Sequence, residues 1–182
     1  MSIPPGHYPI DPRNGQLTLR TFREGMAAMV GHDLVIEVTQ WRGTVTVPDG
    51  AGSTPQIAVE LDMGSLEVRE GLRGVVPLTD KDRVEIKGII AETLKTKAIP
   101  KASFKSTNVQ VEGDHAGVDG EFTLAGRTHP LHMTAQAGGD HTVTVTGTVQ
   151  QTSWGITPYK AFLGALKVKD TVEVEATVRL PS

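Results

Sequence analysis

Histidine is the first residue type to consider for chemistry, because its imidazole ring binds metals and transfers protons near neutral pH. The chain has six histidines, and His129 and His132 form an H-x-x-H pair around Pro130. The pair lies in a run that reads as a strand, where residues three apart point to opposite faces of the sheet. Pro130 also favours extended backbone at the residue before it. The spacing therefore argues against a shared metal ion, and the sequence predicts no metal site.

A further histidine, His32, stands beside Asp33 where an apolar run begins at Leu34. Adjacent residues of a strand face opposite ways, so Asp33 is badly placed to orient His32 as in a catalytic triad. We interpret His32 as a polar contact at the mouth of a cavity. A small-molecule enzyme that uses His32 stays open as a less favoured alternative.

Other catalytic signatures do not occur in the chain. It has no cysteine, no G-x-S-x-G elbow and no glycine-rich phosphate loop. Two carboxylate pairs, Glu60/Asp62 and Glu173/Glu175, have the two-residue spacing of one strand face. Among alternating apolar residues, this spacing is typical of the solvated side of a sheet. The sequence therefore predicts no catalytic residue, no cofactor and no enzyme activity.

The segments that must position these residues read mostly as β-strands. Apolar and polar residues alternate over residues 141–149 and 172–180, the pattern of a strand with one buried face. Shorter runs of the same kind, separated by turn residues, occur at residues 16–22, 34–38, 44–47, 57–63, 103–111, 117–124 and 131–137. Many short strands with even spacing predict an all-β barrel or sandwich.

One segment, residues 80–98, has helical spacing instead. Its apolar side chains recur every four residues, at Ile86, Ile90 and Leu94. Thr79 and Asp82 match a capping box, and Pro100 closes the segment. We expect a helix that covers the sheet as a lid or buttress; its mixed charge argues against a membrane-surface helix. A second helix or an irregular turn is expected around residues 158–165.

Composition bounds the remaining classes of function. The 18 basic and 21 acidic residues are scattered along the chain, without the basic stripe that nucleic-acid binders use. No apolar run approaches the length of a membrane span, and the first residues do not resemble a signal peptide. We therefore expect a cytoplasmic protein with no nucleic-acid partner and no integral membrane segment. A secreted protein whose leader has been removed stays open as the alternative location.

Aromatic residues make up only 4% of the chain, so their placement is informative. Several large apolar residues lie in or beside predicted strands, where they can line an interior: Leu34, Phe104, Phe122, Trp154, Phe162 and Leu163. An eight-stranded barrel has room either for side chains alone or for one small ligand. The sequence does not choose between these two interiors.

Several short motifs follow one another along almost the whole chain. They are Y-x-I-D at residues 8–11, P-x-x-x-F-x-S at 100–106, G-x-F-T-(apolar)-x-G-x-T-x-P at 120–130, W-G-I at 154–156 and a final strand over 170–178. In this order they resemble the YceI-like family of lipocalin-like barrels. The chain departs from the family pattern at Asn14-Gly15, at Gln151 and over residues 92–99, which bears on the ligand's head group more than on the fold.

The resemblance implies a single YceI-like domain over residues 1–182. Its fold would be all-β, an eight-stranded antiparallel lipocalin-like barrel with one or two short helices. The family is associated with polyisoprenoids, so the resemblance implies carriage or storage of a polyprenyl chain or quinone tail in the barrel. A homodimer formed at the entrance is compatible with this reading. The alternative from another class is a filled barrel that acts as a structural or protein-interaction module.

Overall fold

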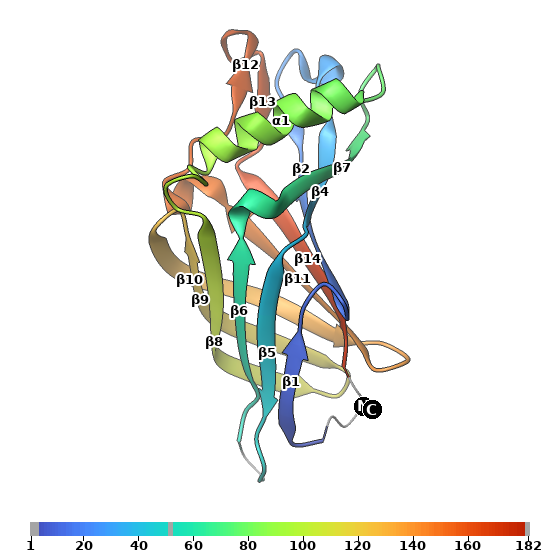
Figure 1. The fold of residues 1–182 in the computed structure, drawn as a ribbon, viewed down its shortest axis with the longest axis vertical. Coiled ribbons are helices and arrows are strands. Elements are labelled where there is room, and N and C mark those ends of the chain that lie inside the picture. The colour runs from blue at the N-terminus through green and yellow to red at the C-terminus, as the bar shows by residue number, and fades with distance from the viewer. Residues whose placement is uncertain (1–3, 51–52, 181–182) are drawn as a thin grey trace.

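A computed structural model describes residues 4–50 and 53–180. Its main feature is an eleven-stranded antiparallel sheet with the order β1-β5-β6-β8-β9-β10-β11-β14-β2-β4-β7. The sheet is strongly curled, with α1 lying across one end (Figure 1). The strands are β1 (Gly6–Ile10), β2 (Gly15–Thr21), β4 (Asp33–Val38), β5 (Trp41–Val47), β6 (Gln56–Asp62), β7 (Leu66–Leu72), β8 (Lys101–Glu112), β9 (His115–Leu124), β10 (Arg127–Ala137), β11 (Thr142–Gln150) and β14 (Thr171–Arg179).

The expected eight-stranded barrel is wrong in its strand count, and no closed barrel is seen in the described part of the chain. Three stretches break into two strands each: β1 and β2, β4 and β5, and β6 and β7. The two halves of each stretch lie near opposite ends of the strand order. The chain itself therefore joins the two ends of the curled sheet, although β1 and β7 are not paired with each other.

A buried serine fixes two of these breaks. Ser65 lies in the 3-10 helix η2 (Met63–Ser65), between β6 and β7. Its hydroxyl donates to the carbonyl of Asp62 at 2.7 Å and accepts from the backbone N–H of Gln40 at 3.0 Å. Gln40 lies between β4 and β5, so one side chain ties both breaks together. Backbone groups that leave the sheet at these breaks thus keep partners in the interior.

The core lies on the inner, concave face of the sheet. In β10, residues with odd numbers from His129 to Ala137 are less exposed than their even-numbered neighbours. This alternation confirms the predicted strand and its inward face. The main buried cluster includes Leu17, Ile36, Trp41, Leu66, Trp154 and Val178.

The predicted helix is confirmed as α1 (Asp80–Thr93). Thr79 and Asp82 form the expected capping box at its first turn. The helix ends before residue 98 because Lys95 adopts a left-handed backbone, with φ of 54°. Arg83 fastens α1 to β7 by donating to the carbonyls of Val68 at 3.0 Å and Arg69 at 2.7 Å. No helix among the described residues is long and apolar enough to cross a membrane.

The region around residues 158–165 is an irregular hairpin. It contains β12 (Lys160–Ala161), the 3-10 helix η4 (Phe162–Gly164) and β13 (Leu166–Val168). With β3 (Arg23–Glu24) it forms a small second sheet in the order β12-β13-β3. Figure 1 shows β12 and β13 at the end of the molecule opposite β1. The described residues stop short of both ends of the predicted domain, since residues 1–3 and 181–182 lie outside them.

Candidate functional site

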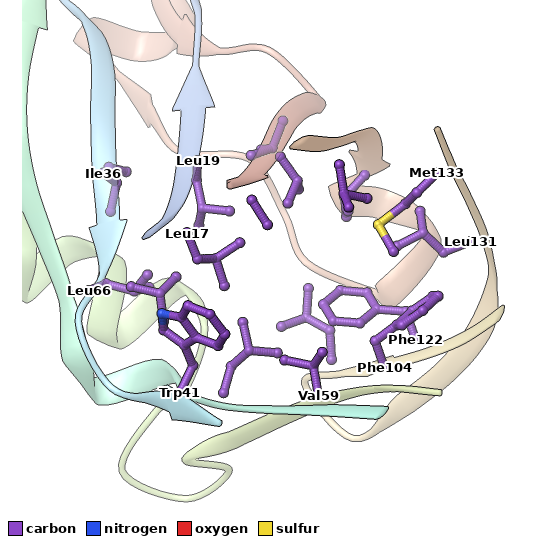
Figure 2. A pocket seen from close by; sticks show the side chains of 18 of the residues that line it. Leu17, Leu19, Ile36, Trp41, Val59, Leu66, Phe104, Phe122, Leu131 and Met133 are labelled. Carbon is purple, nitrogen blue, oxygen red and sulfur yellow. The ribbon is translucent and has the colours of Figure 1, made fainter. Parts of the chain in front are cut away.

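The curled sheet encloses an apolar cavity of about 510 Å³ between its inner face and α1. Ligand pockets in proteins commonly have volumes of roughly 300–1,000 Å³. Figure 2 shows side chains from many strands pointing toward a common space, among them Leu17, Leu19, Ile36, Trp41, Val59, Leu66, Phe104, Phe122, Leu131 and Met133. The helix contributes Ile86, Ile90 and Leu94 from its apolar stripe. The cavity can therefore enclose an apolar molecule almost without polar contacts.

Two aromatic rings form one wall of this cavity. Phe104 of β8 stands directly opposite Phe122 of β9 in the strand register. Gly120 leaves space for the Phe104 ring, because a Cβ atom at position 120 would lie 2.3 Å from Phe104 Cζ. The G-x-F segment that carries the family resemblance thus has a packing role: its glycine seats one ring and its phenylalanine supplies the other.

Three of the six predicted lumen residues line the cavity. They are Leu34, Phe104 and Phe122. Phe104 is only 5% exposed, and the other two are partly buried. Their contact with a ligand stays a prediction.

Trp154, also expected in the lumen, lies behind the cavity wall. Its side chain is buried, and its indole N–H donates to the carbonyl of Phe122 at 3.0 Å. The ring meets Phe122 edge-on, with centroids 5.7 Å apart. Trp154 therefore supports Phe122 from behind and does not line the lumen. The Phe122 carbonyl is the partner that the N–H of a buried indole needs.

The prediction that Phe162 and Leu163 line the lumen is wrong. Both were expected inside, but Phe162 is 67% exposed and Leu163 is fully exposed, outside the cavity wall. They lie at the tip of the β12–β13 hairpin, with φ angles of 50° and 55°. The left-handed backbone turns both side chains away from the sheet, which the apolar character of the segment did not indicate.

His32 lines the cavity. Its Nε2 donates to the carbonyl of Val76 at 2.6 Å. The ring occupies a space that a side chain at Gly74 would block, since a Cβ atom there would lie 2.1 Å from Nε2. His32 thus lies in the cavity wall, while its position at the mouth and its role as a ligand contact stay predictions.

Asp33 faces away from His32, as the strand pattern predicts. Its buried carboxylate accepts from the backbone N–H of Arg23 at 2.9 Å and pairs with Arg73 at 3.3 Å. The two residues therefore do not form a catalytic pair. Asp33 instead holds the start of β4 against β3.

Besides His32, the cavity wall contains further polar residues, among them Gln151, Arg23 and Lys167. Arg23 and Lys167 were not identified from the sequence. Arg23 and Lys167 come from the paired strands β3 and β13, which are only two and three residues long. Such short strands leave no alternation to read, so the sequence carries no signal for these positions.

The histidine pair of β10 does not converge. His129 lies on the inward side with its ring edge-on to Trp154 at 5.4 Å, whereas His132 on the outer face bonds Asp119 at 2.7 Å. The predicted opposite orientation is confirmed. The hydrogen bond from His132 lowers the pKa of Asp119 below its usual value. Among the described residues, no group of three or more His, Cys, Asp or Glu side chains is placed to hold a metal ion.

Comparison with known proteins agrees with this architecture. The chain is similar in fold to Burkholderia cenocepacia BcnA, with a TM-score of 0.68, 14% identity, and coverage of 95% of this chain and 99% of that one. It is also similar to the Campylobacter jejuni YCEI protein, with a TM-score of 0.58, 10% identity, and coverage of 81% and 84%. No curated protein sequence matches the chain. The model of the YceI-like domain matches residues 8–180. The chain therefore belongs to the YceI-like family.

Proposed function

We propose that this protein binds a hydrophobic isoprenoid-type lipid, such as a polyprenyl chain or quinone tail, in the cavity and carries or stores it. The observation that supports this most directly is the cavity itself, about 510 Å³ in volume and lined mainly by aliphatic and aromatic side chains. Each CH₂ group that leaves water for such a site contributes about 0.8 kcal/mol. Affinity can thus come from the chain length of the ligand without specific polar contacts.

The volume limits how much of a lipid the cavity accepts. A polyprenyl chain that is longer than the cavity therefore extends, with its head group, toward the mouth. Arg23, His32 and Lys167 line the cavity and can supply polar contacts for a head group.

The cavity favours this function over a filled barrel. A structural or interaction module needs no internal space, because close-packed interiors keep few voids larger than a water molecule. The enzyme alternative lacks a nucleophile beside His32. Among the described residues that line the cavity there is neither serine nor cysteine, and Nε2 of His32 is held by the Val76 carbonyl.

Mass spectrometry of an organic extract tests the proposal directly. The protein is purified without detergent, and its extract is compared with that of a mock preparation. We expect a prenyl compound in stoichiometric amount, either as purified or after incubation with prenyl alcohols of increasing length. Affinity should rise with the length of the prenyl chain and level off at the length that fills the cavity. A clean extract after both treatments would support the filled-barrel module instead.

A further inference from the structure

Six large apolar side chains stand in solvent at the end of the molecule that carries β12 and β13. We name them the apolar rim: Met26, Met29, Val75, Val76, Phe162 and Leu163. Each is between 63% and 110% exposed. Single exposed apolar residues are ordinary on a protein surface, but a cluster of them marks a site of interaction.

The three loops that carry the apolar rim touch one another. The backbone N–H of Ala27 donates to the carbonyl of Ala165 at 2.9 Å, which joins the loop between β3 and β4 to the β12–β13 hairpin. The N–H of Val75 donates to the carbonyl of Met29 at 3.3 Å, which joins the loop after β7 to the loop between β3 and β4. The six side chains therefore belong to one continuous surface.

This surface surrounds one end of the cavity. Gly31 and Leu166, from two of the three loops, line the cavity. They also pack together, because a Cβ atom at Gly31 would lie 2.6 Å from Leu166 Cδ1. His32, in the same wall, donates a hydrogen bond to the carbonyl of Val76 in the rim. A molecule that enters or leaves at this end passes through the apolar rim.

The hairpin tip holds its two apolar side chains outward at a cost. Phe162 and Leu163 are consecutive residues with positive φ, a conformation that is strained for an L-residue. Neither side chain gains burial within the chain in return. Strain of this kind, maintained without internal benefit, points to a role outside the folded chain.

The loops that carry the apolar rim have an excess of basic side chains, which favours a negatively charged partner. Residues 22–31, 71–79 and 158–169 contain five basic side chains and one acidic one, although the whole chain carries a net charge of −3. The hairpin alone has Lys160, Lys167 and Lys169 with no acidic residue between 158 and 169. Within residues 4–50 and 53–180, none of these three lysines forms an ion pair. Apolar tips flanked by lysines match a bilayer of anionic lipids, which offers hydrocarbon below a negative surface.

We propose that the apolar rim docks this end of the protein onto the surface of an anionic lipid bilayer. Phe162 and Leu163 enter the interfacial layer, and the two exposed hairpin lysines, Lys160 and Lys169, contact the lipid phosphates. Docking itself needs no ligand in the cavity. Its use as a route by which a lipid passes between bilayer and cavity rests on the function proposed above.

Co-sedimentation with vesicles tests the docking. Wild-type protein should bind vesicles of phosphatidylcholine with phosphatidylglycerol, bind phosphatidylcholine alone more weakly, and lose binding as salt screens the charges. Phe162→Gly and Leu163→Gly should each weaken binding about tenfold, or about 1.4 kcal/mol. Glycine adopts positive φ without strain, so both variants should unfold at a temperature no lower than the wild type.

A charge pair of variants supplies the control. Lys160→Glu changes an exposed lysine of the hairpin and should weaken binding to the anionic vesicles. Lys105→Glu makes the same change at an exposed position of β8, away from the apolar rim, and should leave that binding unchanged. Uptake of farnesol from solution, measured without vesicles, should stay the same in Leu163→Gly, which separates failure of docking from failure of the cavity function.

Two results would overturn the docking. One is a wild-type protein that does not bind the anionic vesicles, or binds them equally well after Phe162→Gly, Leu163→Gly and Lys160→Glu. The other is a dimer or a complex with another protein that Leu163→Gly disrupts while vesicle binding is absent. In that case the apolar rim is a protein interface.

Discussion

Replacing Met133 by glutamate places a carboxylate inside the cavity, and we expect it to weaken binding of an apolar ligand strongly at neutral pH. Met133 lies on the inward face of β10 and points into the cavity (Figure 2). Its side chain is only partly buried, so in the absence of ligand the carboxylate can keep some water. An apolar ligand would remove that water.

The size of the effect follows from desolvation. An ion taken out of water inside a protein costs several kcal/mol even after the surroundings relax. Taking about 3 kcal/mol, the loss of affinity is roughly a hundredfold. The cost falls only on the ionised form, whose ordinary pKa is about 4.3 and is raised further by burial. Binding should therefore recover as the pH is lowered through that raised pKa, and weaken again as the pH rises.

Titration with farnesol, followed by tryptophan fluorescence, measures this affinity. Trp41 lines the cavity and reports on its occupation. The matched control is Thr134→Glu, the same change one residue along β10 on the exposed outer face. If folded Met133→Glu binds farnesol as tightly as Thr134→Glu does, the cavity is not the binding site and the proposed function is wrong.

Stability and the titration of Glu60 offer four further predictions. Thr79→Ala removes the cap of α1 and should cost about 1 kcal/mol, lowering the melting temperature by roughly 2–4 °C in calorimetry. Gly88→Ala, where an added Cβ meets nothing within 4 Å, should stabilise α1 by up to about 1 kcal/mol in urea unfolding. Gly120→Ala should destabilise by about 1–3 kcal/mol in the same assay, since the Cβ would lie 2.3 Å from an aromatic carbon; equal effects of the two alanines would contradict this packing. Hydrogen bonds from Lys101, then Arg42, lower the pKa of Glu60, so their stabilisation is complete above the ordinary pKa of glutamate and is lost as pH falls through the lowered one. Lys101→Gln should raise the Glu60 pKa measured by NMR, and an unchanged pKa would show that the ion pair is not formed in solution.

Local patterns in the sequence predicted several features that the structure confirms. The capping box of Thr79 and Asp82 involves residues three apart, so one short stretch of chain contains the whole interaction. Alternation in β10 likewise predicted that His129 and His132 point to opposite faces. The motif order was sufficient to identify the YceI-like family, which the match over residues 8–180 confirms.

The strand count could not be obtained in this way. Two strand breaks depend on hydrogen bonds from Ser65, which meets Gln40 across 25 positions of the chain. Nothing near Gln40 in the sequence indicates that partner. Alternation did separate residues 34–38 from residues 44–47, but it predicted no run at β7, and the eight strands expected from the family resemblance became eleven.

The sequence by itself determined the class of fold, the family and the faces of the long strands, because these depend on contacts between near neighbours and on periodicity. Only the tertiary structure decided which apolar side chains meet a ligand. Phe104, Trp154 and Phe162 are all aromatic residues in or beside strands, yet one lines the cavity, one supports its wall and one stands in solvent. Their difference arises from the way the sheet curls and the β12–β13 hairpin turns outward, which places residues by long-range packing that residue type does not encode.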